Sequence, residues 1–517
     1  MTIKPELIET LREKREHITQ YLTPEKLKVM HDKGSLSARE RVDLLFNEGT
    51  FQETGMYAQH KALHFGMKDR DLPGDGVITG TGYIGGKQVS AFCQDFNVLA
   101  GTLGKMQARK ITSIMHYAAK TGTPVVAFKD SGGARIQEGV DALSGYGNVF
   151  FNNVLLSGVV PQIAVICGPC AGGAAYSPAL MDFVIMTRKN SYMCLTGPEV
   201  IKAVTGRSTT IEEIGSAEMH ASVSGNAHFI AEDDLHAVEL VKQILDHLPS
   251  NNTEDPPHDL AQPIYMEEDH AIDALIPSSP SELFDMYTII RRLVDNGALL
   301  EVHANFARNV IVGFARISGV IVGIIANQPM VLAGALDRDA SDKVARFIRT
   351  CNVFNVPLVT LVDVPGFLPG VEEERGGIIR HGAKMLHSFA SCTTPKITVI
   401  LRKAYGGSYL AMCSQELGAD MVFAWPTAEI AVMGADAAVK MLFRKDLAAA
   451  EDRPALAAEL TQQYRDSFAS PYEAASNFYI TDVIEPCQTR STVSLALRKL
   501  LSKRVLRPNK KHGNMPL

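Results

Sequence analysis

Two glycine pairs, Gly172-Gly173 and Gly406-Gly407, each follow a short apolar run, with one pair in each half of the chain. Glycine tolerates positive φ and lets a ligand approach the main chain closely. A helix that begins at such a loop presents unpaired amides and the positive end of its dipole. One pair alone would more simply indicate a tight turn. Two pairs in equivalent places favour two oxyanion holes, which would stabilise enolate-like charge with main-chain donors.

The glycine pairs belong to a longer internal repeat, and such a repeat determines the architecture. The run VLAG at 98–101 returns at 331–334, so the offset is 233 residues (331 − 98). The same offset relates Lys110 to Lys343, Pro124 to Pro357, Asp130 to Asp363, and Gly133 to Gly366. After a slip of one residue, Pro161 returns as Pro395. A period of this length predicts two duplicated domains rather than a solenoid.

Each copy of the repeat shows the same order of predicted elements. In the first copy we expect a hairpin over 76–92, a helix near 103–118, a buried strand at 125–128, a helix near 147–156 and a strand at 161–166. In the second copy we expect a hairpin over 313–326, a helix over 344–354, a buried strand at 357–362, a helix over 377–390 and a strand at 397–401. Alternating strands, glycine loops and helices indicate an α/β fold.

The remaining segments suggest how the two domains are delimited. The first roughly 45 residues form a helical arm by their pattern. Proline, asparagine and aspartate cluster over 249–263, which is typical of a linker. We therefore expect an N-terminal domain over 1–255, including the arm, and a C-terminal domain over 256–517.

Composition excludes several classes of protein. The chain of 517 residues is 46% hydrophobic and 21% charged, with a formal net charge of −6, so nucleic acid is not an expected partner. No run approaches the roughly 20 apolar residues of a membrane span, and residues 1–15 lack the apolar core of a secretion signal. Eight cysteines in so long a chain indicate reduced thiols and a cytoplasmic location.

Other motifs fail their context tests. The GxGxxG match at 80–85 is followed by a predicted strand rather than a helix, so it does not predict dinucleotide binding. Cys167 and Cys170 form a lone CxxC, which is weak evidence for zinc and leaves a redox role as a minor alternative. No serine lies in GxSxG. We predict neither a metal site nor a nucleophile elbow.

Six runs carry a family resemblance: DSGGARIQEG (130–139), GPCAGGAAYSPAL (168–180), TGPEVIKAVTG (196–206), DVPGFLPG (363–370), RKAYGGSYLAM (402–412) and AWPTAEIAVMG (424–434). Together they closely resemble the carboxyltransferase (beta) subunit of biotin-dependent acyl-CoA carboxylases, over nearly the whole chain. The resemblance implies two tandem crotonase-like (ClpP/crotonase) domains. It also implies transfer of a carboxyl group between N1 of carboxybiotin and the α-carbon of an acyl-CoA.

The resemblance also assigns residues to the two holes. The acyl-CoA enolate maps to Gly172 and Gly173, with Gly132, Gly133, Ala134, Arg135 and Leu410 as further acyl-CoA residues. The biotin side maps to Gly407 and Ser408, with Gly366, Phe367, Tyr405 and Gly406 beside them. Ser408 stands where relatives often have alanine, a change to which a main-chain donor is indifferent.

The resemblance implies partners as well. The sequence has no Met-Lys-Met biotinylation segment and no ATP-grasp glycine loop, so we expect biotin on a separate carrier protein and a separate biotin carboxylase. Relatives form homo-hexamers of two stacked trimers, in which a first domain faces the second domain of another subunit.

The acyl group and the direction of transfer stay open. Leu410 stands where propionyl-CoA carboxylases commonly have aspartate. An apolar residue at this position resembles the transcarboxylase and methylmalonyl-CoA decarboxylase relatives, and the alternative is that Leu410 only packs. Propionyl-CoA and methylmalonyl-CoA are the expected pair. A crotonase-type hydratase or hydrolase and a silent scaffold are the alternatives.

Overall fold

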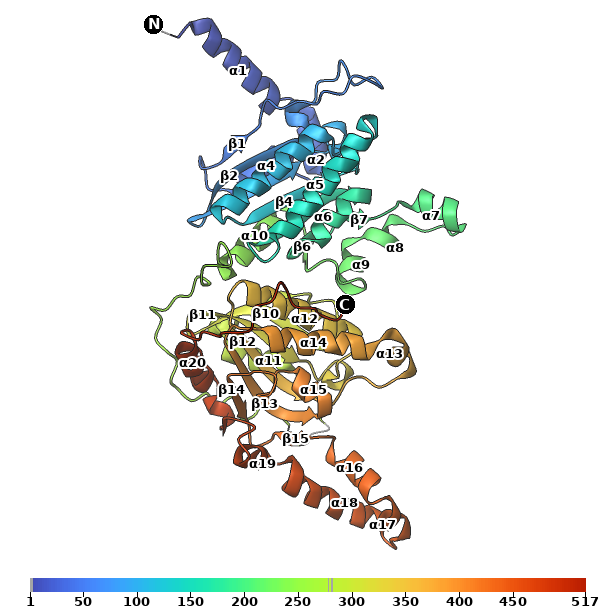
Figure 1. Ribbon diagram of the computed structural model, residues 1–517, viewed down its shortest axis with the longest axis vertical. Helices are drawn as coiled ribbons and strands as arrows, with labels where there is room; N and C mark the ends of the chain where they lie inside the picture. The colour runs from blue at the N-terminus through green and yellow to red at the C-terminus, as the bar shows by residue number, and fades with distance from the viewer. Residues whose placement is uncertain (1–2, 278, 280–281) are drawn as a thin grey trace. The chain divides into compact units, whose positions relative to one another are not determined.

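The chain divides into two compact units, Met1–Glu254 and Asp255–Leu517, in a computed structural model (Figure 1). The structure describes residues 3–277, 279 and 282–517. The division falls inside the segment 249–263, which contains no helix or strand. Among the described residues, no helix has the length and apolar character needed to cross a membrane.

Unit 1 is built on a mixed sheet of eight strands in the order β1-β2-β3-β4-β5-β6-β8, with β7 paired to β5. The strands β1 to β3 are antiparallel and the others are parallel. Their bounds are β1 Gln52–Thr54, β2 Val77–Ile84, β3 Lys87–Gln94, β4 Val125–Ser131, β5 Gln162–Ala171, β6 Phe183–Thr187, β7 Tyr192–Cys194 and β8 Phe229–Ala231. The hairpin and both apolar runs predicted as strands are therefore confirmed.

Helices cover both faces of this sheet. Their bounds are α1 Pro5–Thr19, α2 Pro24–Asp32, α3 Ala38–Leu45, α4 Lys105–Thr121, α5 Val140–Leu156, α6 Tyr176–Ala179, α7 Pro198–Thr205, α8 Ile211–Gly215, α9 Ala217–Ser222 and α10 Asp234–His247. The apolar faces of α4 and α5 form one core with alternate residues of the central strands, while α3 and α10 pack on the other side. The predicted N-terminal arm corresponds to α1, α2 and α3.

Unit 2 repeats this sheet in the order β16-β14-β13-β12-β11-β10-β9, with β15 paired to β13. Its strands are β9 Leu300–Val302, β10 Val310–Ile317, β11 Val320–Asn327, β12 Leu358–Val364, β13 Lys396–Tyr405, β14 Met421–Ala424, β15 Glu429–Ala431 and β16 Asp482–Val483. Its helices are α11 Met286–Leu293, α12 Arg338–Val353, α13 Val371–Gly376, α14 Ile378–Ser391, α15 Gly406–Ala411, α16 Ala435–Leu442, α17 Arg444–Ala449, α18 Arg453–Tyr464, α19 Pro471–Ser476 and α20 Thr489–Leu500. Every element predicted for the second copy is present.

The repeat extends to single side chains. Lys110 and Lys343 lie on α4 and α12, and both ammonium groups are buried among main-chain carbonyls. Lys110 donates to the carbonyls of Gly74 and Val77, and Lys343 donates to four carbonyls between His303 and Val310, the first residue of β10. The lysines thus anchor the same loop in each unit, so their recurrence in the sequence has a structural cause.

Candidate functional site

The first glycine pair lies where β5 ends and a helical segment begins. Gly172 has φ of 62°, a left-handed conformation that favours glycine, and it opens a 3-10 turn, Gly172–Ala175, that leads into α6. The short strand β7 pairs with the last residues of β5 and holds this corner. The first amides of a helix have no acceptor within it, and they point outward with the positive end of the dipole. Gly173 therefore carries a donor suited to an anion.

A second loop meets the first at the end of β4. Ser131 pairs with Cys170 across the two strands, and a Cβ atom on Gly133 would lie 3.0 Å from the carbonyl oxygen of Ala171. The amide of Gly132 donates to the carbonyl of Ala100 at 2.9 Å. The amide of Gly133 donates to Ser131 Oγ at 3.2 Å. The fold itself thus uses both glycine amides that the resemblance placed near the acyl-CoA.

Ala134 supplies the free amide of this loop. Leu103 donates to the carbonyl of Gly133 and accepts from the amide of Arg135, both at 2.9 Å, so the Ala134 amide between them faces away from Leu103. Within the described part of the chain, that amide has no hydrogen-bond partner. The amides of Ala134 and Gly173 therefore belong to two touching loops, which is the arrangement of a two-donor oxyanion hole.

The side chain of Arg135 holds this loop in place through buried ion pairs. Its side chain is fully buried, and Nη1 lies 2.6 Å from Asp75 Oδ1 and 2.8 Å from Glu138 Oε1. Burial raises the pKa of Asp75, and the Arg135 charge opposes that rise. The guanidinium thus ties this loop to Asp75 and Glu138.

The second hole repeats this design in unit 2. Gly406 has φ of 58° at the end of β13, and α15 begins there. A Cβ atom on Gly407 would meet no atom within 4 Å, so open space lies in front of that residue. Ser408 is buried, and its Oγ donates to the carbonyl of Tyr405 at 2.7 Å, which ties the side chain into its own turn.

The partner loop of the second hole ends β12. Leu336 donates to the carbonyl of Gly366 at 3.1 Å and accepts from the amide of Leu368 at 2.8 Å. These bonds reproduce those of Leu103, and they leave the Phe367 amide facing away from Leu336. No described residue accepts a hydrogen bond from that amide. Phe367 is therefore the counterpart of Ala134.

Both polar and apolar side chains surround the second hole. The phenol of Tyr405 donates to Glu429 Oε2, and Arg465 Nε lies 3.3 Å from Glu429 Oε1. Burial and the neighbouring Glu429 charge raise the pKa of Tyr405, so its phenol stays neutral. Leu410 lies on α15, with 38% of its surface exposed. The structure thus places Leu410 beside the second hole within unit 2.

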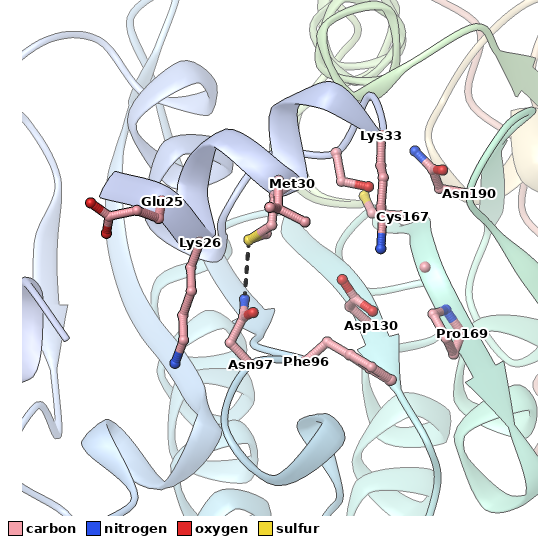
Figure 2. Close-up of a pocket in the computed structure, with 13 residues that line it drawn as sticks. Glu25, Lys26, Met30, Lys33, Phe96, Asn97, Asp130, Cys167, Pro169 and Asn190 are labelled. Atoms are coloured by element: carbon pink, nitrogen blue, oxygen red, sulfur yellow. Dashed lines mark hydrogen bonds between the residues drawn. The ribbon is translucent and has the colours of Figure 1, made fainter. Parts of the chain in front are cut away.

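A cavity of about 540 Å³ lies in unit 1, between α2 and the carboxyl ends of the parallel strands (Figure 2). Lys26 of α2 and Lys33, which directly follows α2, point into it, and Asn97, Asn190 and Pro169 line its other walls. Two ammonium groups over a largely apolar floor suit a phosphorylated ligand with an aromatic base. The sequence pattern gave no sign of this cavity, because α2 reaches the strand ends only through the fold.

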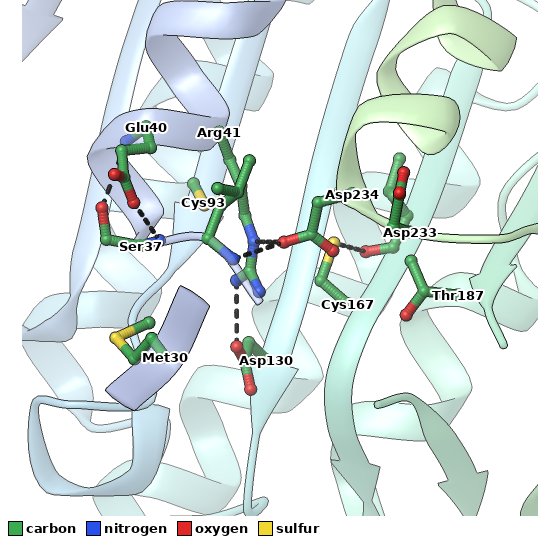
Figure 3. A network of polar contacts seen from close by, with 12 residues as sticks. Met30, Ser37, Glu40, Arg41, Cys93, Asp130, Cys167, Thr187, Asp233 and Asp234 are labelled. Carbon is green, nitrogen blue, oxygen red and sulfur yellow. Dashed lines mark hydrogen bonds and ion pairs between the residues drawn. The ribbon is translucent and has the colours of Figure 1, made fainter. Parts of the chain in front are cut away.

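A buried ion network lies behind the cavity (Figure 3). Arg41 of α3 contacts Asp130 Oδ2 through Nη1 at 2.9 Å and Asp234 Oδ2 through Nε at 2.8 Å. Burial raises the pKa of Asp130 to about 6, although the Arg41 charge opposes that rise. In unit 2, Arg402 Nη2 contacts Asp363 Oδ2 at 2.8 Å. The repeated aspartates thus hold the ends of β4 and β12, a structural role that their recurrence alone did not reveal.

Comparison with known proteins agrees with this geometry. Residues 29–515 match the carboxyl transferase domain family. The methylmalonyl-CoA decarboxylase subunit alpha of Propionigenium modestum is 50% identical over 100% of both chains. The methylmalonyl-CoA carboxyltransferase 12S subunit of Propionibacterium freudenreichii subsp. shermanii is 51% identical over 98% of this chain and 97% of its own. The propionyl-CoA carboxylase beta chain of Saccharopolyspora erythraea is 52% identical over 94% of this chain and 91% of its own.

Solved structures show the same fold. The transcarboxylase 12S hexamer, solved with methylmalonyl-CoA bound, superposes with a TM-score of 0.97 at 50% identity, covering 100% of this chain and 99% of its own. A single-chain, multi-domain long-chain acyl-CoA carboxylase has a TM-score of 0.81 at 27% identity, covering 96% of this chain and 50% of its own. Both units are therefore crotonase-like domains. This chain belongs to the carboxyl transferase family, as a carboxyltransferase of the biotin-dependent acyl-CoA carboxylase type.

Proposed function

We propose that this chain moves a carboxyl group between N1 of biotin, attached to a separate carrier protein, and the α-carbon of an acyl-CoA, with propionyl-CoA and methylmalonyl-CoA as the acyl pair. The observation that carries this proposal is the presence of two equivalent holes, each with a helix-start amide and a free loop amide. Carboxyl transfer makes negative charge on two oxygens, the thioester oxygen and the ureido oxygen. Preorganised amides stabilise such charge most strongly away from water.

Unit 1 is the proposed acyl-CoA side. The amides of Ala134 and Gly173 would hold the thioester oxygen as the enolate forms. Lys26 and Lys33, which line the cavity of the same unit, would bind the phosphates of CoA. Binding energy from the remote nucleotide would then position the α-carbon for reaction. Gly132, Gly133 and Arg135 would fix the loop that carries the Ala134 amide.

Unit 2 is the proposed biotin side. Biotin supplies the nitrogen that carries the carboxyl group, and the carrier protein supplies its mobility. The open space in front of Gly407 can admit a ring, and the amides of Gly407 and Phe367 would donate hydrogen bonds to its negatively charged oxygen. Gly406 sets the turn, Ser408 adds a further helix-start amide, and the neutral phenol of Tyr405 borders the site.

The acyl choice rests on the relatives and on Leu410. Relatives of about 50% identity are named for methylmalonyl-CoA and propionyl-CoA. An apolar Leu410 suits a substrate with an α-methyl group. The same site would serve a carboxylase, a decarboxylase or a transcarboxylase, and the partner subunits would determine the direction.

The assembly is part of the same proposal. We expect a homo-hexamer, since the related 12S subunit is described as a hexamer. A biotin carboxyl carrier protein and, for a carboxylase, a biotin carboxylase would be the other subunits. All eight cysteines are free thiols, which supports a reducing compartment and hence the cytoplasm.

Assay of the purified chain with free biotin tests this function. Methylmalonyl-CoA should be converted to propionyl-CoA only when biotin is present, and faster than malonyl-CoA is converted to acetyl-CoA. Hydration of crotonyl-CoA serves as the negative control. A preference for malonyl-CoA would overturn the acyl assignment, while hydration without any effect of biotin would overturn the carboxyl transfer.

A further inference from the structure

Lys129 is a buried cation without a carboxylate partner, located behind the first hole. It occupies β4, and only 3% of its surface is exposed. Its Nζ donates to Ser177 Oγ at 3.1 Å and lies 4.7 Å from the centre of the Phe92 ring. No described carboxylate comes within ion-pair distance of this ammonium group, and its pKa is influenced by Cys170 alone among charged or titratable neighbours. A buried ammonium costs several kcal/mol unless it is compensated, so its retention calls for an explanation.

The other four buried lysines are held differently. Lys343 donates to four main-chain carbonyls, Lys110 to two, and Lys396 to those of Phe389 and Leu417. The Nζ of the fourth, Lys403, lies 3.9 Å from Asp363 Oδ2. An ammonium group has three donors, and Lys129 uses a single hydroxyl and an aromatic face. Carbonyl anchoring and a carboxylate partner thus account for the other four lysines but not for Lys129.

Ser177 connects Lys129 to the hole. It lies on α6, one helical turn after Gly173, and its Oγ donates to Asn153 Oδ1 at 3.0 Å. Asn153 in turn donates to Gln162 Oε1 at 3.0 Å. The positive charge thus lies beside the helical segment formed by the 3-10 turn Gly172–Ala175 and α6. The first amides of this segment face the proposed oxyanion, and the charge adds to their field.

Unit 2 offers an internal comparison. Lys129 pairs with Ile166 across β4 and β5, and Val362 pairs with Ile400 at the equivalent place between β12 and β13. The counterpart of Ser177, at the offset of 234, is the buried Ala411. Within the described ranges, the second hole therefore has the same backbone, with Val362 and Ala411 at the places of Lys129 and Ser177.

We propose that Lys129 is a positioning residue that makes the first hole the stronger of the two, by stabilising charge on the thioester oxygen through space. This inference rests on the proposed acyl-CoA role of unit 1. A thioester enolate is a strongly basic anion that forms at a high cost in free energy. A cation behind its hole would lower that cost. An additional cation would be less valuable at the ureido oxygen.

The charge of Lys129 depends on pH. Burial lowers its pKa to about 8, so the charge is present at neutral pH and is lost as the pH rises through that value. The neighbouring titratable group on β5, Cys170, has its pKa raised to about 12 by burial and stays neutral. Burial also raises the pKa of Tyr146 on α5. Asp130 follows Lys129 in β4 but points to the opposite face, where Arg41 pairs with it.

The test uses the full chain with Lys129→Met and with Lys129→Gln, which can keep a hydrogen bond to Ser177 without the charge. Lys396→Met, at the start of β13, is the matched loss of a buried lysine away from the hole. The probe is a CoA thioether that ends in a nitro group, because its nitronate carries the charge of an enolate and absorbs in the ultraviolet. We expect both Lys129 variants to raise the pKa of the bound nitro group by about one unit, a tenfold effect, and Lys396→Met to leave it unchanged.

The pH profile provides the second readout. Biotin-dependent loss of CO2 from methylmalonyl-CoA should decline above about pH 8 in the wild type, and this decline should be absent in Lys129→Gln, which should be about tenfold slower at pH 7. A folded Lys129→Gln with the wild-type nitronate pKa and the wild-type decline would overturn the inference. If neither variant folds, a flat wild-type profile from pH 7 to 10 would overturn it. A wild type without biotin-dependent turnover would instead refute the proposed function, and the nitro titration would still test Lys129.

Discussion

The two units form their glycine loops with the same main-chain bonds but surround them with different side chains. Leu103 and Leu336 make matching hydrogen bonds that leave the amides of Ala134 and Phe367 free. Behind the first hole lies the cation of Lys129, and behind the second lies the apolar Val362. The comparison teaches that the duplicated units keep the same backbone geometry at their glycine loops, while strand positions that face the helices differ between them in charge.

The largest expected effect concerns the buried arginines that hold the strand ends. Removing one partner of a buried ion pair costs about 3–5 kcal/mol, because a charge stays buried without compensation. Arg41→Met would leave the carboxylates of Asp130 and Asp234 without their guanidinium partner. Arg402→Met would remove the guanidinium from Asp363, which would still have the ammonium group of Lys403 at 3.9 Å. Denaturant unfolding, with hydrogen exchange to distinguish the units, should therefore show the greater loss of stability in unit 1.

Arg188→Met is the control for this comparison. Arg188 pairs with Glu218 and Glu232 at the surface, where its side chain is 43% exposed. Exposed pairs contribute about 0–1 kcal/mol. An equal loss of stability in Arg188→Met and Arg41→Met would show that the buried network does not hold the end of β4.

Blocking one hole at a time tests the division of labour. Gly407 lacks a positive φ, and a Cβ there meets no atom within 4 Å, so Gly407→Val should fold and fill the space in front of the second hole. The amide of residue 407 stays, but the valine side chain would keep the biotin oxygen away from it. Loss of a hole donor costs about 10²–10³ in rate, and by comparison we expect a loss of at least about 100-fold in carboxyl transfer to free biotin. Binding of propionyl-CoA, measured by calorimetry, should be unchanged.

Gly173→Val is the counterpart in the first hole. Its Cβ would lie 3.1 Å from the Tyr146 ring, so this variant should lose acyl-CoA binding together with transfer. Gly147→Ala, on an exposed position of α5 with free space around it, should retain both properties. Normal transfer by both valine variants would refute the two-hole mechanism.

Lys110 and Lys343 permit a smaller test of the duplicated backbone. Replacement by methionine removes two hydrogen bonds to main-chain carbonyls in unit 1 and four in unit 2. The carbonyls of Gly74, His303 and Ala307 each keep a main-chain donor, so the net loss is smaller than these counts. Because an unsatisfied buried acceptor costs about 1–3 kcal/mol and water can reach some of them, we expect Lys343→Met to lose about 1–2 kcal/mol more than Lys110→Met in thermal unfolding. Equal losses would show that the extra bonds contribute nothing.

These lysines also predict a pH dependence. Burial lowers the pKa of both from 10.5 to about 8. Between these values the unfolded chain binds more protons than the folded chain, so this contribution to stability rises with pH. Each methionine variant should reduce that rise, which unfolding at pH 8 and pH 10 can measure.

The sequence repeat predicted the shared features of the two units well, because recurring residues such as Lys110, Lys343 and the glycine pairs serve the common backbone. It could not predict which loop amides stay free. That depends on Leu103, which lies thirty residues from Gly133 and contacts it only through the fold. The repeat also could not predict the features that distinguish the two units. Lys129 has no counterpart at the repeat offset, and Lys26 and Lys33, which line the cavity, lie outside the repeat. A duplication reveals common architecture, and the specialised chemistry lies in the positions that do not recur.

Leu410 carries the smallest expected effect, because it concerns acyl choice rather than the holes themselves. It lies two residues after Ser408 on α15, partly exposed, so Leu410→Asp should leave the fold and the hole intact. A single methyl group in an apolar pocket is worth about 10–200-fold in discrimination. If Leu410 borders the α-methyl group, the aspartate should lower the ratio of kcat/KM for methylmalonyl-CoA over malonyl-CoA by about tenfold. Leu442→Asp, on the exposed face of α16, is the control for added charge. An unchanged ratio would show that Leu410 only packs within its own unit. The choice of acyl group would then have to arise within unit 1, near the Ala134 and Gly173 amides.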